Sequence, residues 1–193
     1  FYNCKGLTSV TIPNSVTTIG SFAFDNCSGL TSVTIGNSVT TIGNSAFRDC
    51  SGLTSVAIPN SVTTIGDQAF YNVNNIIYYG TATGSPWGAK CVNGYVDGYL
   101  VYSDATKTKL CGCSSAVTGE IVIPNSVTTI GDRAFYNCSG LTSPVYNANC
   151  FAYMPPSYQG AYTIPNGIKQ IAGSVFYNCK GLTSVTIPNS VTT

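Results

Sequence analysis

Residues 1–23 read FYNCKGLTSVTIPNSVTTIGSFA, and the same pattern returns in residues 24–46 (FDNCSGLTSVTIGNSVTTIGNSA) and 47–69 (FRDCSGLTSVAIPNSVTTIGDQA). The leading phenylalanine recurs every 23 residues, up to Phe70. A fixed period of this length is typical of a solenoid, in which each coil buries its apolar side chains only against its neighbours. We therefore expect one elongated repeat domain over residues 1–193.

Each unit contains a short alternating segment near its middle. Val10 and Ile12 are apolar, and the intervening Ser9 and Thr11 are polar. β-branched residues with a period of two predict a short strand with one buried face. The Pro-Asn pair that follows predicts a turn. A second short extended piece, residues 16–19, ends at a glycine.

The rest of the unit predicts a helical corner. A Ser, Asn or Asp, the residue types favoured at a helix N-cap, follows the glycine. Ala23, Phe24 and Cys27 are then spaced as one apolar face of a single turn. The expected fold class is thus an α/β repeat solenoid with helical or 3₁₀ turns opposite the strands. Because helix and strand layers differ in width, we expect a curved stack with parallel strands on its concave face.

The repeat resembles a known family. The run IPNSVTTIGDRAFYNCSGLTS at residues 123–143 is similar to the BspA-like, Treponema-type leucine-rich repeat of microbial surface or secreted proteins. The resemblance covers residues 1–82, about 119–145 and 163–193. It implies a secreted or surface-exposed protein that adheres to host proteins or to other cells. It brings no catalytic motif.

The period breaks in two places. Regular coils are expected at about residues 1–77, 119–145 and 163–193, with irregular segments at about 78–118 and 146–162. The regular pattern is already in progress at both chain ends, so we expect a fragment of a longer array. The irregular segments hold the only tryptophan, Trp87, and most of the tyrosines: Tyr78, Tyr79, Tyr95, Tyr99, Tyr102, Tyr146, Tyr153, Tyr158 and Tyr162.

The first irregular segment also predicts a β-hairpin. Residues 98–102 and 107–110 are the two arms, and residues 103–106 are the turn. Tyrosine offers a large contact area at low entropic cost, so a protruding hairpin with tyrosines suits recognition. The alternative is that these rings fill the space where a regular coil is missing. The four tyrosines that follow a repeat phenylalanine share a column with Asp25 and Arg48 and are expected to be exposed.

Composition narrows the class of function. Only 8% of residues are charged and the net charge is +1, so no basic surface for nucleic acid is expected. No apolar run is long enough to cross a membrane. Histidine is absent, which excludes Ser-His-Asp and Cys-His sites and imidazole metal ligands. We expect neither catalysis nor a metal or cofactor. A neutral polar surface is typical of extracellular proteins.

The nine cysteines divide into two groups. Five share one repeat column, and Val73 occupies the same column in the fourth copy. A position that accepts valine is a small apolar site, which favours buried thiols, although bridging between stacked coils stays possible. Column members are Cys4, Cys27, Cys50, Cys138 and Cys179, whereas Cys91, Cys111, Cys113 and Cys150 lie outside the repeat and are open to either interpretation.

Two classes of function follow. The first is a non-catalytic adhesin at the cell surface or outside the cell, whose partner is a host or neighbouring-cell protein or glycan. Its candidate surface has two parts. One is the polar ladder, the Ser and Thr side chains on the exposed face of the first strands: Ser9, Thr11, Ser32, Thr34 and Ser55. The other is the aromatic group of the first break: Trp87, Tyr95, Tyr99 and Tyr102. The second is a self-assembling repeat protein that forms arrays or filaments, because residues 1–18 and 176–193 are identical. Ice binding would need a flat ladder and is not expected on a curved stack.

Overall fold

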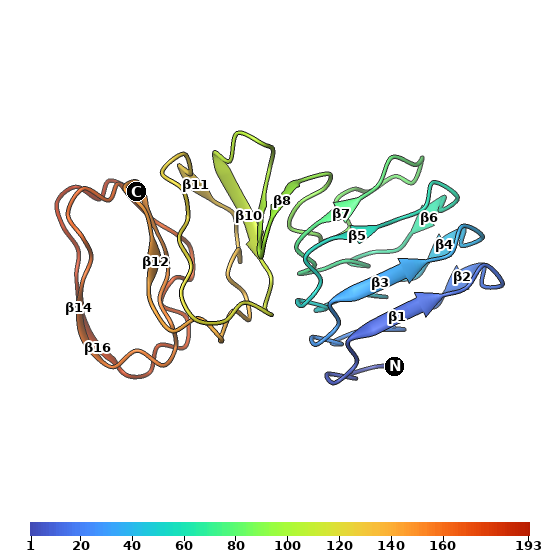
Figure 1. Ribbon diagram of the computed structural model, residues 1–193, viewed down its shortest axis with the longest axis horizontal. Coiled ribbons are helices and arrows are strands. Elements are labelled where there is room, and N and C mark those ends of the chain that lie inside the picture. The colour runs from blue at the N-terminus through green and yellow to red at the C-terminus, as the bar shows by residue number, and fades with distance from the viewer.

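The computed structural model describes residues 1–193 as a solenoid of short strands joined by turns (Figure 1). It contains strands and no helix. None of its elements, accordingly, is an apolar helix long enough to cross a membrane. In chain order the strands are β1 (Ser9–Ile12), β2 (Thr18–Ile19), β3 (Ser32–Ile35), β4 (Thr41–Ile42), β5 (Val56–Ala57), β6 (Thr64–Ile65), β7 (Ile76–Ile77), β8 (Tyr95–Asp97), β9 (Leu100–Tyr102), β10 (Lys109–Cys113), β11 (Thr129–Ile130), β12 (Val145–Tyr146), β13 (Cys150–Tyr153), β14 (Gly160–Thr163), β15 (Gln170–Ile171) and β16 (Leu182–Thr186).

The first coils stack in register with the sequence period. β1 pairs in parallel with β3, and β5 with β7, while β2, β4 and β6 form a second parallel sheet. Thr18, Thr41 and Thr64 are successive partners, 23 residues apart. Each repeat column therefore becomes a line of like residues along the stack, as the spacing predicts.

The predicted helical corners are wrong. After each closing glycine the chain makes consecutive turns in which Phe22 and Asn26 adopt left-handed backbone angles, with φ of 59° and 58°. Left-handed residues cannot continue a right-handed helix. Alternate N–H groups also leave the coil, since Phe24 N donates to Ala46 O at 2.8 Å, and Asn26 N donates to Arg48 O at 2.8 Å. The corner is thus hydrogen-bonded to its neighbour rather than to itself.

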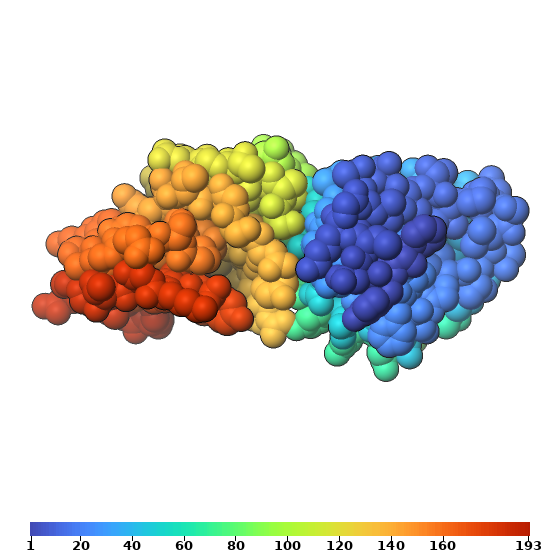
Figure 2. All heavy atoms as spheres, turned by 90° about the horizontal axis from the view of Figure 1, so that it is seen from below, coloured from blue at the N-terminus to red at the C-terminus, as the bar shows by residue number.

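The curvature expected from unequal layers loses its physical basis with the helices. Instead, the stack changes direction at one place. In Figure 1 the blue-to-teal coils stack one above the other, whereas the orange-to-red coils stack across the page. The green and yellow segment between them contains the irregular residues 78–118. Seen from below, the two halves form two lobes joined through this segment (Figure 2). We call the N-terminal half, with the blue-to-teal coils, the first lobe, and the C-terminal half, with the orange-to-red coils, the second lobe.

Stacked phenylalanine rings fill the core of the first lobe. Rings of Phe24 and Phe47 lie 5.1 Å apart and nearly parallel, and those of Phe47 and Phe70 lie 5.5 Å apart. Phe47 and Phe70 are fully buried. The aliphatic columns pack around this stack in one continuous cluster that extends to Trp87 and Ala89. The second lobe has its own clusters, around Leu110 to Tyr153 and around Phe151 to Val175.

Hydrogen bonds join the two lobes. Ser114 Oγ donates to Gly52 O at 3.0 Å, and Ser115 N donates to Ser51 O at 3.1 Å. Lys90 Nζ reaches Asn74 Oδ1 at 2.9 Å in its own lobe and Ala134 O at 3.4 Å in the other. We call this contact between the lobes the joint. These hydrogen bonds fix it, and it includes residues next to the hairpin of the first break.

The predicted hairpin is present. β9 and β10 are antiparallel, with Leu110 opposite Tyr102, and β8 adds a third antiparallel strand that the sequence did not indicate. β10 also pairs in parallel with β11, so the sheet runs in the order β11-β10-β9-β8. In the second break β12 and β13 form a smaller hairpin, and β13 continues the stack through its parallel partner β15. β14 pairs with β16.

Candidate functional site

The polar ladder of the first strands lies on the surface. Ser9 is paired with Ser32 and Thr11 with Thr34, and all four are exposed. Ser55 departs from the row because it lies before β5, is half-buried, and accepts a hydrogen bond from Asn75 Nδ2 at 3.1 Å. On the next strands the Thr column continues as Ala57 and then Ile77, which is 38% exposed. The ladder thus ends after two coils and gives way to apolar residues.

The predicted aromatic residues separate into two pairs. Tyr95 and Tyr99 are 42% and 49% exposed on the hairpin. Tyr102 is 1% exposed and Trp87 is 6% exposed. The Trp87 ring packs edge-on against Tyr78, and its Nε1 donates to Thr83 O at 2.8 Å. Trp87 and Tyr102 therefore fill the core of the irregular coil and do not form a surface. For these two residues the alternative holds, namely that the aromatic rings fill the space of a missing regular coil.

The hairpin carries two lysines, of which Lys109 is exposed on β10 and Lys107 contacts the tyrosines. Lys107 Nζ lies 2.6 Å from Asp97 Oδ2 and over the rings of Tyr95 and Tyr102, at 5.5 and 5.6 Å from their centroids. The hydrogen bond that Lys107 donates to Asp97 raises the pKa of Lys107, so the lysine stays charged. Burial raises the pKa of Tyr102 to about 12. A shallow groove of about 440 Å³ runs from this group to Val122, which is 85% exposed.

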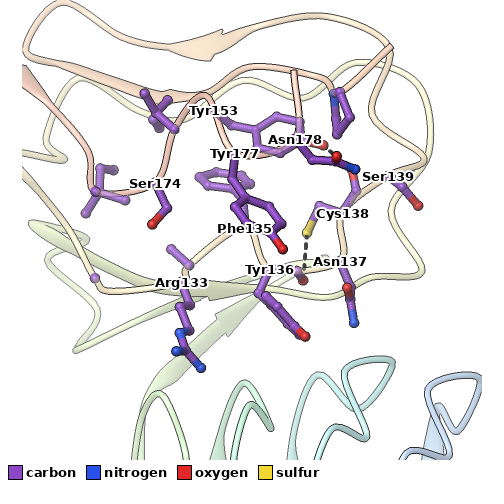
Figure 3. Close-up of a pocket in the computed structure, with 17 residues that line it drawn as sticks. Arg133, Phe135, Tyr136, Asn137, Cys138, Ser139, Tyr153, Ser174, Tyr177 and Asn178 are labelled. Carbon is purple, nitrogen blue, oxygen red and sulfur yellow. Dashed lines mark hydrogen bonds between the residues drawn. The ribbon is translucent and has the colours of Figure 1, made fainter. Parts of the chain in front are cut away.

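A deeper pocket, of about 480 Å³, opens between two repeat corners in the second lobe (Figure 3). One wall is the corner at residues 130–139, and the opposite wall is the corner at residues 173–178. Ala152, Tyr153 and Pro156 of the coil between them form the floor. None of these residues belongs to the surface predicted from the sequence.

A shortened coil creates the pocket. Ile130 and Phe135 are separated by four residues, as are Ile171 and Phe176 in the opposite wall. In the coil between them Phe151 pairs with Ile171, and Met154 takes the phenylalanine position, because Met154 N donates to Val175 O at 3.1 Å as Phe24 N does to Ala46 O. Only two residues separate Phe151 from Met154. This coil is therefore two residues shorter at the corner than its neighbours. As a result, nothing stacks between the two full-length corners on either side.

The pocket has an apolar floor and a polar rim. Phe135 and Tyr153 are buried, with ring centroids 5.5 Å apart, and Tyr153 Oη donates to Cys138 O at 2.9 Å. At the rim Ser139, Ser174, Tyr177 and Asn178 are exposed. Ser174 and Asn178 have left-handed backbone angles, with φ of 58° and 61°, as do Arg133 and Asn137 at the equivalent positions of the opposite wall. Few polar groups over an aromatic base are typical of small-ligand sites.

Charge is sparse around the pocket. Its only charged lining residue is Arg133, whose guanidinium lies 5.2 Å from the ring centroid of Tyr71 in the other lobe. Asn137 also turns that way and donates to Ser51 Oγ at 3.4 Å. Figure 3 shows Arg133, Tyr136 and Asn137 extending toward the N-terminal coils. Burial raises the pKa of Tyr153, which keeps its phenol protonated as a donor.

The sequence contains a signal for this pocket that spacing alone could have shown. The run FAYM at residues 151–154 stands where IGDRAF stands at residues 130–135. LCGC at residues 110–113 is shortened in the same way, since Leu110 pairs with Ile130 and Cys113 N donates to Ala134 O at 2.7 Å. A helical corner does not fix the alignment of columns across the breaks, so the prediction of helical corners does not reveal the missing residues.

The repeat defines the family of the chain. The BspA type leucine rich repeat region matches it in six copies, over residues 1–82 and 146–193. The protein belongs to this family. The match includes residues 146–162, which the period alone treats as irregular, and leaves out the coil at residues 119–145. Comparison with curated proteins gives no match.

Several solved structures are similar to this BspA-type chain. One is a leucine rich cell surface protein from Faecalibacterium prausnitzii, 26% identical over all of this chain and 56% of its own, with a TM-score of 0.48. Another is a leucine-rich repeat protein from Eubacterium ventriosum, 23% identical over 99% of this chain and 56% of its own, also at 0.48. The T. pallidum leucine rich repeat protein is 22% identical over 98% of this chain and 61% of its own, at 0.38. The chain thus spans little more than half of the first two.

Proposed function

We propose that this BspA-type protein is a non-catalytic binding protein of the cell surface or the extracellular space that recognises a glycan on a host or neighbouring cell. The family supports a binding role for the repeats, and one similar structure is that of a cell surface protein. The proposal of a glycan ligand depends on one observation, the pocket between the corners at residues 130–139 and 173–178.

The chemistry of the pocket suits a sugar. Sugar rings have C–H faces that pack on aromatic rings, and hydroxyl groups that pair with amides and hydroxyls. Phe135 and Tyr153 supply the aromatic base, and Ser139, Tyr177 and Asn178 supply donors and acceptors at the rim. Because no carboxylate lines the pocket, neutral and acidic sugars are both compatible with its charge. A volume of about 480 Å³ accommodates one or two sugar rings.

Tyr177 gives a matched test. The sequence FYNC occurs at residues 1–4, 135–138 and 176–179, and the tyrosines of the first and last copies, Tyr2 and Tyr177, are 67% and 76% exposed. Of these two exposed tyrosines, only Tyr177 lines the pocket. The purified protein is first screened on a glycan microarray, and the strongest glycan is then titrated by calorimetry. Tyr177→Ala should weaken binding about tenfold or more, the effect of losing about 1.4 kcal/mol, whereas Tyr2→Ala should leave it unchanged.

Blocking the pocket provides a second variant. Ser139 is exposed at the rim and has an ordinary backbone conformation, so Ser139→Trp should fold and occlude the opening. Glycan binding that survives both Tyr177→Ala and Ser139→Trp would refute the site. Attachment to whole cells that is lost after protease treatment, but kept after glycosidase treatment, would point to a protein partner instead.

A further inference from the structure

Two of the cysteines outside the repeat meet at the first break. Cys111 lies in β10, and Cys91 follows the short coil that packs on β7, where its carbonyl accepts a hydrogen bond from Ile76 N at 3.1 Å. Their Sγ atoms are 2.7 Å apart. This separation is closer than unbonded sulfur atoms normally pack and is within about 1 Å of a disulfide bond. The sequence separation of the two cysteines is 20 residues.

The repeat-column cysteines behave differently. The Sγ of Cys27 lies 3.0 Å from Phe1 O, and that of Cys50 lies 3.0 Å from Phe24 O. Cys138 and Cys179 make the same contact, at 3.6 Å, with the residue that takes the phenylalanine position one coil earlier. Each of these buried or half-buried thiols therefore has a carbonyl partner, so the column is a line of S–H donors. Cys138 also has a side-chain hydrogen bond with Cys113, but its Sγ contacts the Cys113 carbonyl as well. Cys91 and Cys111 differ from these because their Sγ atoms lie only 2.7 Å apart.

The surroundings of the pair are dry and close-packed. Cys91 and Cys111 are 9% and 4% exposed, and they form a small cluster with the fully buried Val101. A Cβ atom added at Gly94 would lie 2.8 Å from Cys91 Sγ and 2.7 Å from Tyr102 O, so this position has room only for glycine. Cys113 follows Cys111 by two residues but packs in the separate cluster around Leu110 and Tyr153. The local packing thus selects Cys111, not Cys113, as the partner of Cys91.

We propose that Cys91 and Cys111 form a disulfide bond in the protein as it exists outside the cell, and that the bond fastens the β8–β9 hairpin to the first lobe. The oxidant is a small-molecule disulfide. The Cys91 thiolate attacks one sulfur of that reagent and releases a thiolate. Cys111 then loses its proton and attacks Cys91 Sγ, which releases the second thiolate. Two protein thiols are oxidised by two electrons, and one reagent disulfide is reduced to two thiols, which take up the two protons.

The hydrogen bonding of the pair is consistent with this order of attack. The side-chain hydrogen bond between the two cysteines lowers the pKa of Cys91 to about 7, and the same contact raises the pKa of Cys111. Cys91 is therefore the thiol that ionises first near neutral pH. Because the thiolate is the attacking species, Cys91 takes the first step and Cys111 resolves the mixed disulfide.

The bond would close a loop around the exposed tyrosines. Residues 92–110 contain β8, β9 and the turn with Lys107. Hydrogen bonds already join them to the coils on both sides, since Gly94 N donates to Asn75 Oδ1 and Thr128 N donates to Thr108 O, both at 2.9 Å. A cross-link of this span reduces the freedom of the unfolded loop and keeps Tyr95 and Tyr99 in a fixed position. This inference concerns the first break and does not depend on the glycan pocket of the second lobe.

Peptide mapping tests the bond directly. The protein is refolded in a glutathione buffer with the disulfide form in excess, alkylated at acid pH and digested with trypsin without reduction. Cleavage after Lys90, Lys107, Lys109 and Arg133 places Cys91 in peptide 91–107 and Cys111 in peptide 110–133. We expect these two peptides to be linked, the linked mass to disappear on reduction, and seven of the nine thiols to be alkylated. Fragmentation of the linked pair distinguishes Cys111 from Cys113.

Melting curves separate the bond from simple packing. Reductant should lower the Tm of the wild type by about 6 to 12 °C, the effect expected for a loop of this size in a chain of this length. Reductant should leave the Tm of Cys91→Ser and of Cys111→Ser unchanged. Cys150→Ser is the control, since Cys150 is fully buried outside the repeat and has only Gln170 Oε1 and Val127 O near its sulfur, so it should respond like the wild type.

Nine alkylated thiols after this refolding would overturn the proposal. A link between any other two cysteines would do the same, as would a wild-type Tm that reductant does not change. Because the first of these readouts uses the unmodified protein, it is decisive even if a serine variant fails to fold.

Discussion

Replacing Phe47 with alanine tests whether the stacked phenylalanine rings hold the first coils together. Phe47 is fully buried, and its ring lies nearly parallel to Phe24 and Phe70, at 5.1 and 5.5 Å. Alanine would leave a ring-sized cavity in the middle of the column. Coils on both sides are fixed by backbone hydrogen bonds at the strands and at the corners, so they cannot close the gap.

The expected loss follows from these contacts. Phenylalanine-to-alanine changes in well-packed cores lower the free energy of unfolding by about 3 to 5 kcal/mol, and rigid surroundings favour the upper half of this range. This range already includes the ring–ring contacts, of which Phe47 makes two and each of which contributes about 0.5 to 1.5 kcal/mol. We therefore expect a loss of about 4 kcal/mol, or a decrease in Tm of about 8 to 16 °C.

Urea denaturation followed by circular dichroism and by tryptophan fluorescence measures this loss. Trp87 is the only tryptophan and belongs to the same core cluster as Phe47, so its emission reports on the affected lobe. Phe22→Ala is the matched control, because Phe22 is 50% exposed on a corner of the same stack and should lose less than about 1 kcal/mol. A loss below about 1.5 kcal/mol for Phe47→Ala, or equal losses for the two variants, would refute the account of the core.

Two further predictions concern the cysteine column and the joint between the lobes. Burial raises the pKa of Cys50 to about 12, so the folded state keeps a proton that the unfolded thiol loses near pH 8.5, and the free energy of unfolding should decrease between about pH 8.5 and 12. Cys50→Val copies Val73 and should change the free energy of unfolding at pH 7 by less than about 1.5 kcal/mol. Urea titrations at pH 7, 9 and 10.5 should show a smaller decrease of this free energy with pH in the variant than in the wild type. An equal decrease in both proteins would contradict the burial of this thiol. At the joint a Cβ on Gly112 would lie 2.7 Å from Asn74 Oδ1 and 3.1 Å from Lys90 Cδ. Gly112→Ala should therefore cost about 1 to 3 kcal/mol and increase amide hydrogen exchange at residues 110–115. Gly20→Ala is the control, because Gly20 has open space around it and no left-handed backbone angle, so exchange at residues 110–115 should stay unchanged.

The strands and the stacking were predictable from the sequence because both follow from local alternation and a constant period. β1 at Ser9–Ile12 and β2 at Thr18–Ile19 lie where residues 9–12 and 16–19 predict extended structure. The corners were not predictable in the same way. Apolar residues spaced i, i+1 and i+4 fit one helical turn as well as consecutive turns. The choice depends on hydrogen bonds to the next coil, such as Phe24 N to Ala46 O, which exist only after stacking.

Burial within a column shows the same dependence on neighbours. The prediction that tyrosines following the repeat phenylalanine are exposed holds for Tyr2 and Tyr177, at 67% and 76%, whereas Tyr71 and Tyr136 are half-buried. Asp25 of the same column is only 1% exposed, because Arg48, one coil later, lies over it with Nε 3.1 Å from Oδ1. A single position therefore does not fix its own exposure. The residue 23 positions away decides it, and a prediction that treats each column as uniform misses such pairs.

The candidate pocket and the joint between the lobes share one cause. The full corner at residues 131–134 lies between two shortened coils, LCGC at residues 110–113 and FAYM at residues 151–154, so it lacks a stacking neighbour on both sides. On the side of LCGC the first lobe occupies the free space, since the Arg133 guanidinium lies over Tyr71 and Lys90 Nζ reaches Ala134 O. On the second side no other segment enters, and the space remains as the pocket. Two absent residues in each coil thus account for one contact that joins the lobes and one opening that a ligand can occupy.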